Sequence, residues 1–98
     1  MDERAETHDP LWPLSLRLAK RGLVVERGAD GLCVAVEGDP DARDTITCRP
    51  RPEDGGRLWF WTSRGEPIAE ADGRHTDDAA LYVFAHLARR QGDAGARR

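Results

Sequence analysis

Apolar residues change their spacing along the chain, from helical to alternating and back to helical. They first recur at helical spacing over residues 11–19, directly after Asp9 and Pro10, which suit the N-cap and the first position of a helix. Basic residues and a glycine follow at 20–22, as they often do where a helix ends. The pattern therefore predicts a short helix that begins at Asp9 and ends before Gly22.

From Leu23 onward, apolar and polar residues alternate, as they do in strands. Segments rich in Gly, Asp and Pro interrupt the alternation and favour turns. Pro67 has no amide hydrogen to donate, so the last strand, which begins directly after it, should lie at a sheet edge. The predicted strands cover residues 23–25, 32–36, 44–49, 58–62 and 68–71, and residues 38–43 are predicted to be a loop.

A second helix follows the strands. Thr76, Asp77 and Asp78 suit its first turn, apolar residues recur at helical spacing up to Ala88, and a basic last turn precedes Gly92. This order predicts a two-layer α+β fold, an antiparallel four- or five-stranded β-meander with N- and C-terminal helices packed on one face. We expect a single domain over residues 9–91 and disordered tails over residues 1–8 and 92–98.

The length of the turn at residues 53–56 decides which sheet face carries Trp59 and Trp61, because a slip of one residue exchanges the two faces. An even loop pairs Cys48 with Trp61 and turns both tryptophans toward the helices. We favour this arrangement. An odd loop would leave both indole rings open beside Arg49, whose guanidinium could then stack on an indole.

Two regions offer more apolar surface than one small domain can cover. The apolar arc of the first helix spans about 200°, whereas a surface helix needs a stripe nearer 100°. If the tryptophans face inward, Leu58 and Phe60 form a second outer patch, and exposed patches of this kind usually mark a partner. The predicted partner-binding residues are Trp12, Leu16, Ala19, Leu58, Phe60, Arg49 and Arg51.

Charge and composition exclude several classes of function. The chain has 15 basic and 18 acidic residues and a formal charge of -3, which argues against a duplex DNA binder because phosphate binding needs a basic surface. No apolar run approaches the ~20 residues that span a bilayer, and the acidic start lacks the pattern of a secretory signal. We expect a cytoplasmic protein with no membrane contact. Cys33 and Cys48 are too few for a disulfide framework, so we expect two unbonded core residues.

Two acidic clusters are candidate metal sites. Asp39, Asp41 and Asp44 lie close together in sequence, but they lack the glycine and glutamate of a calcium-binding loop, so we interpret them as a solvated turn. The second cluster consists of Asp72, His75, Asp77 and Asp78. Capping of the second helix explains it, and we predict no metal site.

Tyr82 and His86 lie one turn apart on the second helix, with Asp78 one turn before them. They form a possible acid and base pair on the solvent face of that helix. Neither serine nor cysteine residues occur in a nucleophile motif, and the chain has no phosphate-binding glycine motif. We therefore predict no catalytic residue and no cofactor.

The run from Arg57 to Ala69 contains the Leu-Trp-Phe-Trp strand and a Gly-Glu-Pro turn. It resembles a stretch found in small uncharacterised accessory proteins of high-GC Gram-positive bacteria. The resemblance implies a small intracellular domain that assists another protein, and it implies no catalytic residue.

The leading hypothesis is a non-enzymatic protein-binding or adaptor domain that acts as a homodimer or as an accessory subunit. The alternative is a binder of single-stranded nucleic acid or of a flat small ligand. Its stacking platform would consist of Trp59 and Trp61 with Phe60, and its charged edge of Arg57 with Arg49 and Arg51.

Overall fold

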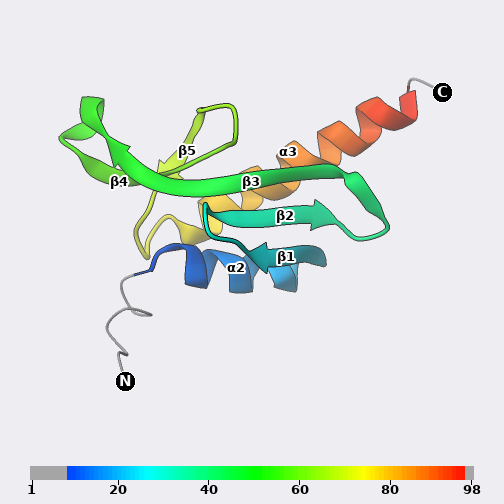
Figure 1. Cartoon of the computed structure of the whole chain (residues 1–98), viewed down its shortest axis with the longest axis horizontal. Coiled ribbons are helices and arrows are strands. Elements are labelled where there is room, and N and C mark those ends of the chain that lie inside the picture. The colour runs from blue at the N-terminus through cyan, green and yellow to red at the C-terminus, as the bar shows by residue number, and fades with distance from the viewer. Residues whose placement is uncertain (1–8, 97–98) are drawn as a thin grey trace.

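The computed structural model describes residues 9–96, with the side chains of residues 9–90. Five antiparallel strands form one sheet in the order β1-β2-β3-β4-β5, and a helix lies at each end of the chain (Figure 1). The predicted α+β meander is confirmed. The elements are α2 (Leu11–Lys20), β1 (Leu23–Arg27), β2 (Leu32–Val36), β3 (Asp39–Arg51), the 3-10 helix η1 (Pro52–Asp54), β4 (Arg57–Trp61), β5 (Pro67–Glu70) and α3 (Thr76–Ala96).

Only one of the two predicted disordered tails can be compared with the structure, and there the structure differs from the prediction. The tail predicted for residues 1–8 lies outside the described residues. At the other end, α3 continues through Gly92 to Ala96, so residues 92–96 are helical where a disordered tail was predicted. Gly92 and Gly95 lower the stability of this helix without ending it, because a glycine costs only about 1 kcal/mol. Over residues 9–96, no helix is long and apolar enough to cross a membrane.

Both helices pack on the same face of the sheet, as predicted. The core consists of the inward-facing residues of both layers, and it has the alternation of a sheet with one covered face. Leu14, Leu18, Val34, Ile46 and Phe60 are fully buried in it. The other core residues are Leu11, Leu23, Leu32, Ala79, Ala80, Val83 and Leu87.

Strand β3 is thirteen residues long and begins earlier than predicted. The turn before it is only Glu37-Gly38, because Val36 pairs with Asp39, and the φ of 82° at Gly38 suits glycine. The predicted loop at residues 38–43 is therefore wrong beyond Gly38. A bulge between Ala35 and Val36 interrupts the ladder here, and such an irregularity accommodates Pro40 in the strand.

The loop between β3 and β4 is odd, and this inverts the favoured arrangement of the tryptophans. Arg51 pairs with Arg57, which leaves residues 52–56 as the loop, and Cys48 pairs with Phe60. The 3-10 turn at residues 52–54, followed by two glycines with positive φ, sets this length. Phe60 therefore faces the helices, whereas the two tryptophans lie on the opposite face, which neither α2 nor α3 covers.

Candidate functional site

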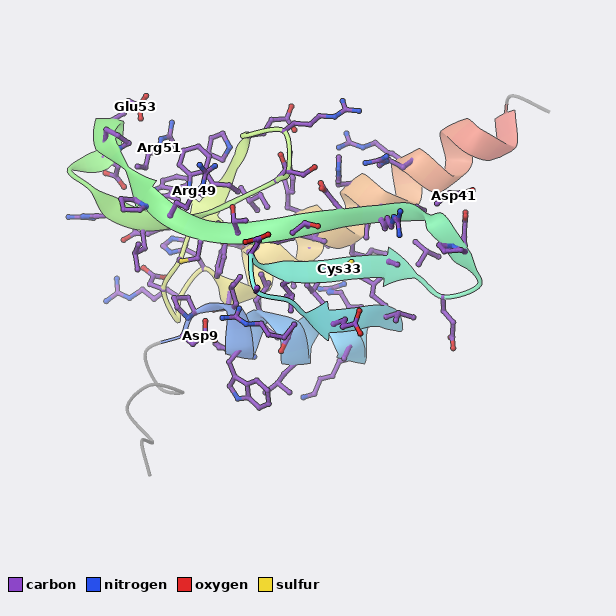
Figure 2. The ribbon with its side chains drawn as sticks, viewed as in Figure 1. Asp9, Cys33, Asp41, Arg49, Arg51 and Glu53 are labelled. Atoms are coloured by element: carbon purple, nitrogen blue, oxygen red, sulfur yellow. The ribbon has the colours of Figure 1, made fainter. Side chains whose placement is uncertain are left out.

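The open face of the sheet carries aromatic and basic side chains from β3 and β4. Strand alternation directs them away from the two helices. Figure 2 shows Arg49 and Arg51 on β3 at the end opposite to Asp41, near the turn to β4. We call this region the Trp-Arg surface, and it consists of Thr47, Arg49 and Arg51 of β3, paired respectively with Trp61, Trp59 and Arg57 of β4.

Each tryptophan of this surface is covered by an arginine. The guanidinium carbon of Arg51 lies 4.4 Å from the ring centroid of Trp59, and that of Arg49 lies 5.2 Å from the ring centroid of Trp61. Both distances are within the range of cation–π contacts. The diagonal positions of the residues across the two strands permit this stacking.

The indole N–H groups are also bound within the chain. Trp59 Nε1 donates to Asp54 Oδ2 at 2.8 Å, and Trp61 Nε1 donates to the Arg49 carbonyl oxygen at 3.0 Å. Both side chains are half-buried. These bonds fix the rings before any ligand arrives, which reduces the conformational entropy lost on binding.

The arginines keep most of their hydrogen-bonding capacity. Among the described residues, Arg49 has no carboxylate within 4.0 Å, and Arg51 reaches Glu53 only at 3.9 Å. Arg57 lies 3.8 Å from Glu70. Ion pairs this long near the surface contribute little to stability. The guanidinium N–H groups therefore remain available to a carboxylate or a phosphate.

The predicted partner-binding residues do not form one surface. Trp12, Leu16 and Ala19 are exposed on α2, and Trp12 has 57% of its surface accessible. Arg49 and Arg51 belong to the Trp-Arg surface on the open sheet face. Phe60 is fully buried, so its assignment to an exposed patch and to a stacking platform was wrong. Leu58, two residues earlier on the same strand, has the same parity as Phe60 and remains 43% exposed.

A buried carboxylate joins three parts of the fold. The Asp44 side chain is 2% exposed, and its Oδ1 accepts hydrogen bonds from the amide groups of Thr45 at 2.8 Å and Ser63 at 3.3 Å. Its Oδ2 lies 3.2 Å from His86 Nε2, although the pair lacks hydrogen-bond geometry. The ring of His86 stacks on the ring of Tyr82, with 6.1 Å between the two ring centroids.

These contacts correct two predictions. Asp44 is part of the inner face of β3, so Asp39, Asp41 and Asp44 do not share a solvated turn. His86 is only 15% exposed and contacts the sheet, so it does not lie on the solvent face of α3. The sequence did contain a signal for the position of Asp44. Asp44 lies two residues from the apolar Ile46, and residues two apart on a strand face the same side of the sheet. A shallow polar hollow beside Asp44 is lined by Cys33, Asp41, Arg43, Thr45, Ser63 and Arg90.

Asp72 caps the turn at residues 73–75, directly before the first residue of α3. Asp72 Oδ1 accepts hydrogen bonds from the amides of Arg74 and His75 at 2.9 and 3.0 Å, and Thr76 Oγ1 donates to the Asp72 carbonyl oxygen at 2.9 Å. Ligand atoms of Glu70, Asp72 and His75 lie within 4.8 Å of one another. However, His75 Nδ1 is itself 2.7 Å from Asp72 Oδ1, so capping accounts for this arrangement.

This cap makes stability depend on pH in acid. The side-chain hydrogen bond with His75, with smaller contributions from the backbone amides of His75 and Arg74, lowers the pKa of Asp72. A lowered folded-state pKa stabilises the fold above the ordinary carboxyl pKa of about 4, and that contribution is lost as the pH falls through the folded-state value. We expect Asp72→Asn to lower the melting temperature at neutral pH and to have a smaller effect at an acid pH below the folded-state pKa, where Asp72 of the wild type is protonated. Thermal denaturation followed by circular dichroism at both pH values measures this.

Asp78→Asn is the control, because Asp78 is exposed in the first turn of the same helix. Its effect on the melting temperature should be smaller at neutral pH. An Asp72→Asn effect of the same size at both pH values would show that the carboxylate charge does not contribute.

The cysteines lie on opposite faces of the sheet. Both are free, as predicted. Cys48 packs against the core next to Phe60, and burial, followed by the nearby Asp9 carboxylate, raises the pKa of its thiol. Cys33 pairs with Thr45 on the open face and does not belong to the core, so its predicted place in the core was wrong.

Comparisons with protein-family models, with curated proteins and with solved structures find no match to this chain.

Proposed function

We propose that this protein is a non-enzymatic binding domain that holds an acidic protein partner against the Trp-Arg surface. The observation that carries the proposal is the pair of stacked contacts, Arg51 on Trp59 and Arg49 on Trp61, on the sheet face opposite to α2 and α3. Tryptophan and arginine are the residues most enriched among those that dominate binding energy in protein interfaces.

The charge of the surface supports an acidic partner. Three arginines, at positions 49, 51 and 57, share this surface, and the carboxylates nearest to Arg51 and Arg57 lie at the outer limit of an ion pair. A partner carboxylate can form the two parallel hydrogen bonds that a guanidinium offers. A second copy of the same surface would instead place arginine against arginine, which costs free energy.

Single-stranded nucleic acid is the second candidate, because bases stack on aromatic rings and on arginine. Two observations favour the protein partner over it. A guanidinium already covers each half-buried indole, which leaves little ring surface for a base. In addition, the net charge of -3 opposes the approach of a polyanion.

The proposal includes no reaction. The pair of His86 and Asp44 is buried beneath α3 and joins it to the sheet, so we interpret it as structural. On its composition, we place the protein in the cytoplasm as an accessory subunit of a larger assembly.

The test uses two probes, a displayed library of random peptides and a single-stranded oligo(dT). We expect the library to yield peptides rich in Asp and Glu, and we expect Arg49→Glu with Arg51→Glu to weaken their binding by at least about tenfold, equivalent to 1.4 kcal/mol. Fluorescence anisotropy of labelled peptides measures this.

Arg43→Glu is the matched control, because Arg43 is exposed on the open face of the same strand but outside the Trp-Arg surface. Its peptide affinity should stay within about twofold of the wild type. Selected peptides without acidic residues, or peptides that bind the double variant as well as the wild type, would contradict the proposal. Tight oligo(dT) binding that the double variant loses would favour the second candidate.

A further inference from the structure

We propose that two copies of this chain join along their β1 strands, in antiparallel register centred on Val25, so that the two sheets become one and the two α2 helices meet beside the joint. The partner is a second copy of this chain. The inference uses β1 and α2 and not the Trp-Arg surface, so it stands independently of the proposed function.

The two edges of the sheet differ in their protection. Strand β5 contains Pro67, which cannot donate a hydrogen bond, and its ladder with β4 is interrupted between Phe60 and Trp61. Such features prevent a sheet edge from pairing with another chain. Strand β1 has no proline, and its register with β2 is unbroken from Leu23 to Arg27. Within residues 9–96, β1 is therefore the sheet edge that is regular and unprotected.

The hydrogen bonds of the β1–β2 hairpin fix which amides point outward. Gly28 N–H donates to the Gly31 carbonyl oxygen at 2.8 Å. Because residues of an antiparallel strand alternate in the direction of their backbone polar groups, the groups of Leu23, Val25 and Arg27 point away from β2. These three residues form the row of donors and acceptors that a second strand would use.

An apolar hollow accompanies this edge. It runs between α2 and β1 and is lined by Leu11, Trp12, Ala19 and Val25, with Ser15 and Leu32. The charged residues of its lining, Asp9 and Arg27, neutralise each other at 3.0 Å. Beside the edge there is thus an apolar and electrically balanced surface, unlike the basic open face of the sheet.

A second copy fits this edge and hollow together. In a register centred on Val25, that residue faces its own copy, and Leu23 faces Arg27 of the other chain, so outward amides meet outward amides. Glu26 then faces Val24, so like charges do not oppose each other. An unrelated peptide could add a strand to the same edge, but it would leave Trp12 exposed. A second copy brings its own α2, because a two-fold interface presents the same surface on both sides.

The experiment measures molecular mass by light scattering over a dilution series of the full chain. We expect the wild type to have twice the mass of one chain and Trp12→Glu to have half the wild-type mass. Leu81→Glu is the matched control, because Leu81 is similarly exposed, at 53%, on α3. This control should keep the wild-type mass.

Val25→Pro tests the edge itself, since it removes an amide that points away from β2, and it should also halve the mass. If that variant fails to fold by circular dichroism, hydrogen exchange of the wild type decides instead. The Val25 amide should then be protected in the wild type and exchange faster in folded Trp12→Glu. A wild type that stays monomeric at its highest soluble concentration would overturn the proposal, as would a Trp12→Glu variant that keeps the wild-type mass. The variant with Arg49→Glu and Arg51→Glu should remain dimeric, which separates this outcome from that of the peptide test.

Discussion

Phe60→Ala is expected to lower the free energy of unfolding by about 3–5 kcal/mol. Phe60 is the largest fully buried side chain among the described residues, and it lies between Cys48 and Ala69 on the helix-covered face. Its removal would lose apolar contact area and leave a cavity that the packed helices cannot fill. A domain of this size has a total stability of about 5–15 kcal/mol, so a large fraction would be lost. Urea denaturation followed by far-ultraviolet circular dichroism measures the change.

Trp59→Ala is the informative comparison. Trp59 is larger than Phe60 but half-buried on the open face, and its removal would lose one hydrogen bond with Asp54 and one stacked contact with Arg51. We expect a loss of about 1–2 kcal/mol. A loss as large as that of Phe60→Ala would mean that the tryptophans face the helices, and it would contradict the odd loop between β3 and β4.

Asp44→Ala is expected to cost about 3 kcal/mol. The carboxylate accepts hydrogen bonds from the amides of Thr45 and Ser63, and a buried donor without a partner costs about 1–3 kcal/mol. The substitution would also remove the group that faces His86 from the sheet. Asp44→Asn keeps an oxygen that can accept from both amides, so it should cost less. Urea denaturation of the wild type, Asp44→Ala and Asp44→Asn at neutral pH measures their free energies of unfolding and so tests this order.

Asp41→Ala is the control for this series, because Asp41 is exposed on the same strand. Its effect should stay within about 0.5 kcal/mol. If Asp44→Ala changed the stability as little as this control, the carboxylate would not join β3 to α3 as the contacts indicate.

The spacing of apolar residues was enough to predict the two helices, an antiparallel meander of four or five strands, and the packing of both helices on one face of it. The N-terminal helix begins at Leu11, with Pro10 at its N-cap, one residue later than predicted, and the Asp9 carboxylate accepts a hydrogen bond from the Leu11 amide at 3.2 Å. The edge position of Pro67 follows from its missing amide hydrogen and is confirmed by the strand order. In each case a local chemical property determines the outcome.

The face of the tryptophans was not predictable in the same way. It depends on whether the β3–β4 loop has an odd or an even number of residues, and a 3-10 turn followed by Gly55 and Gly56 set that number. Likewise, Pro40 suggested a loop, but the β2–β3 ladder is irregular here: Val36 pairs with Asp39 and Ala35 with Arg43, so Pro40 lies in β3 without a paired residue in β2. The contact of Asp44 with His86 joins residues far apart in the sequence, so the spacing of neighbouring residues could not predict it.

The length of β3 has a consequence for how substitutions combine. Its first half pairs with β2 and its second half with β4, so both hairpins take their alignment from this one strand. A one-residue insertion near Thr45 would invert the parity of one half relative to the other. The buried carboxylate and the stacked arginines could then no longer occupy their present faces together. Insertions in β3 should therefore impair folding and binding at once, whereas insertions in the turns that flank it should affect them separately.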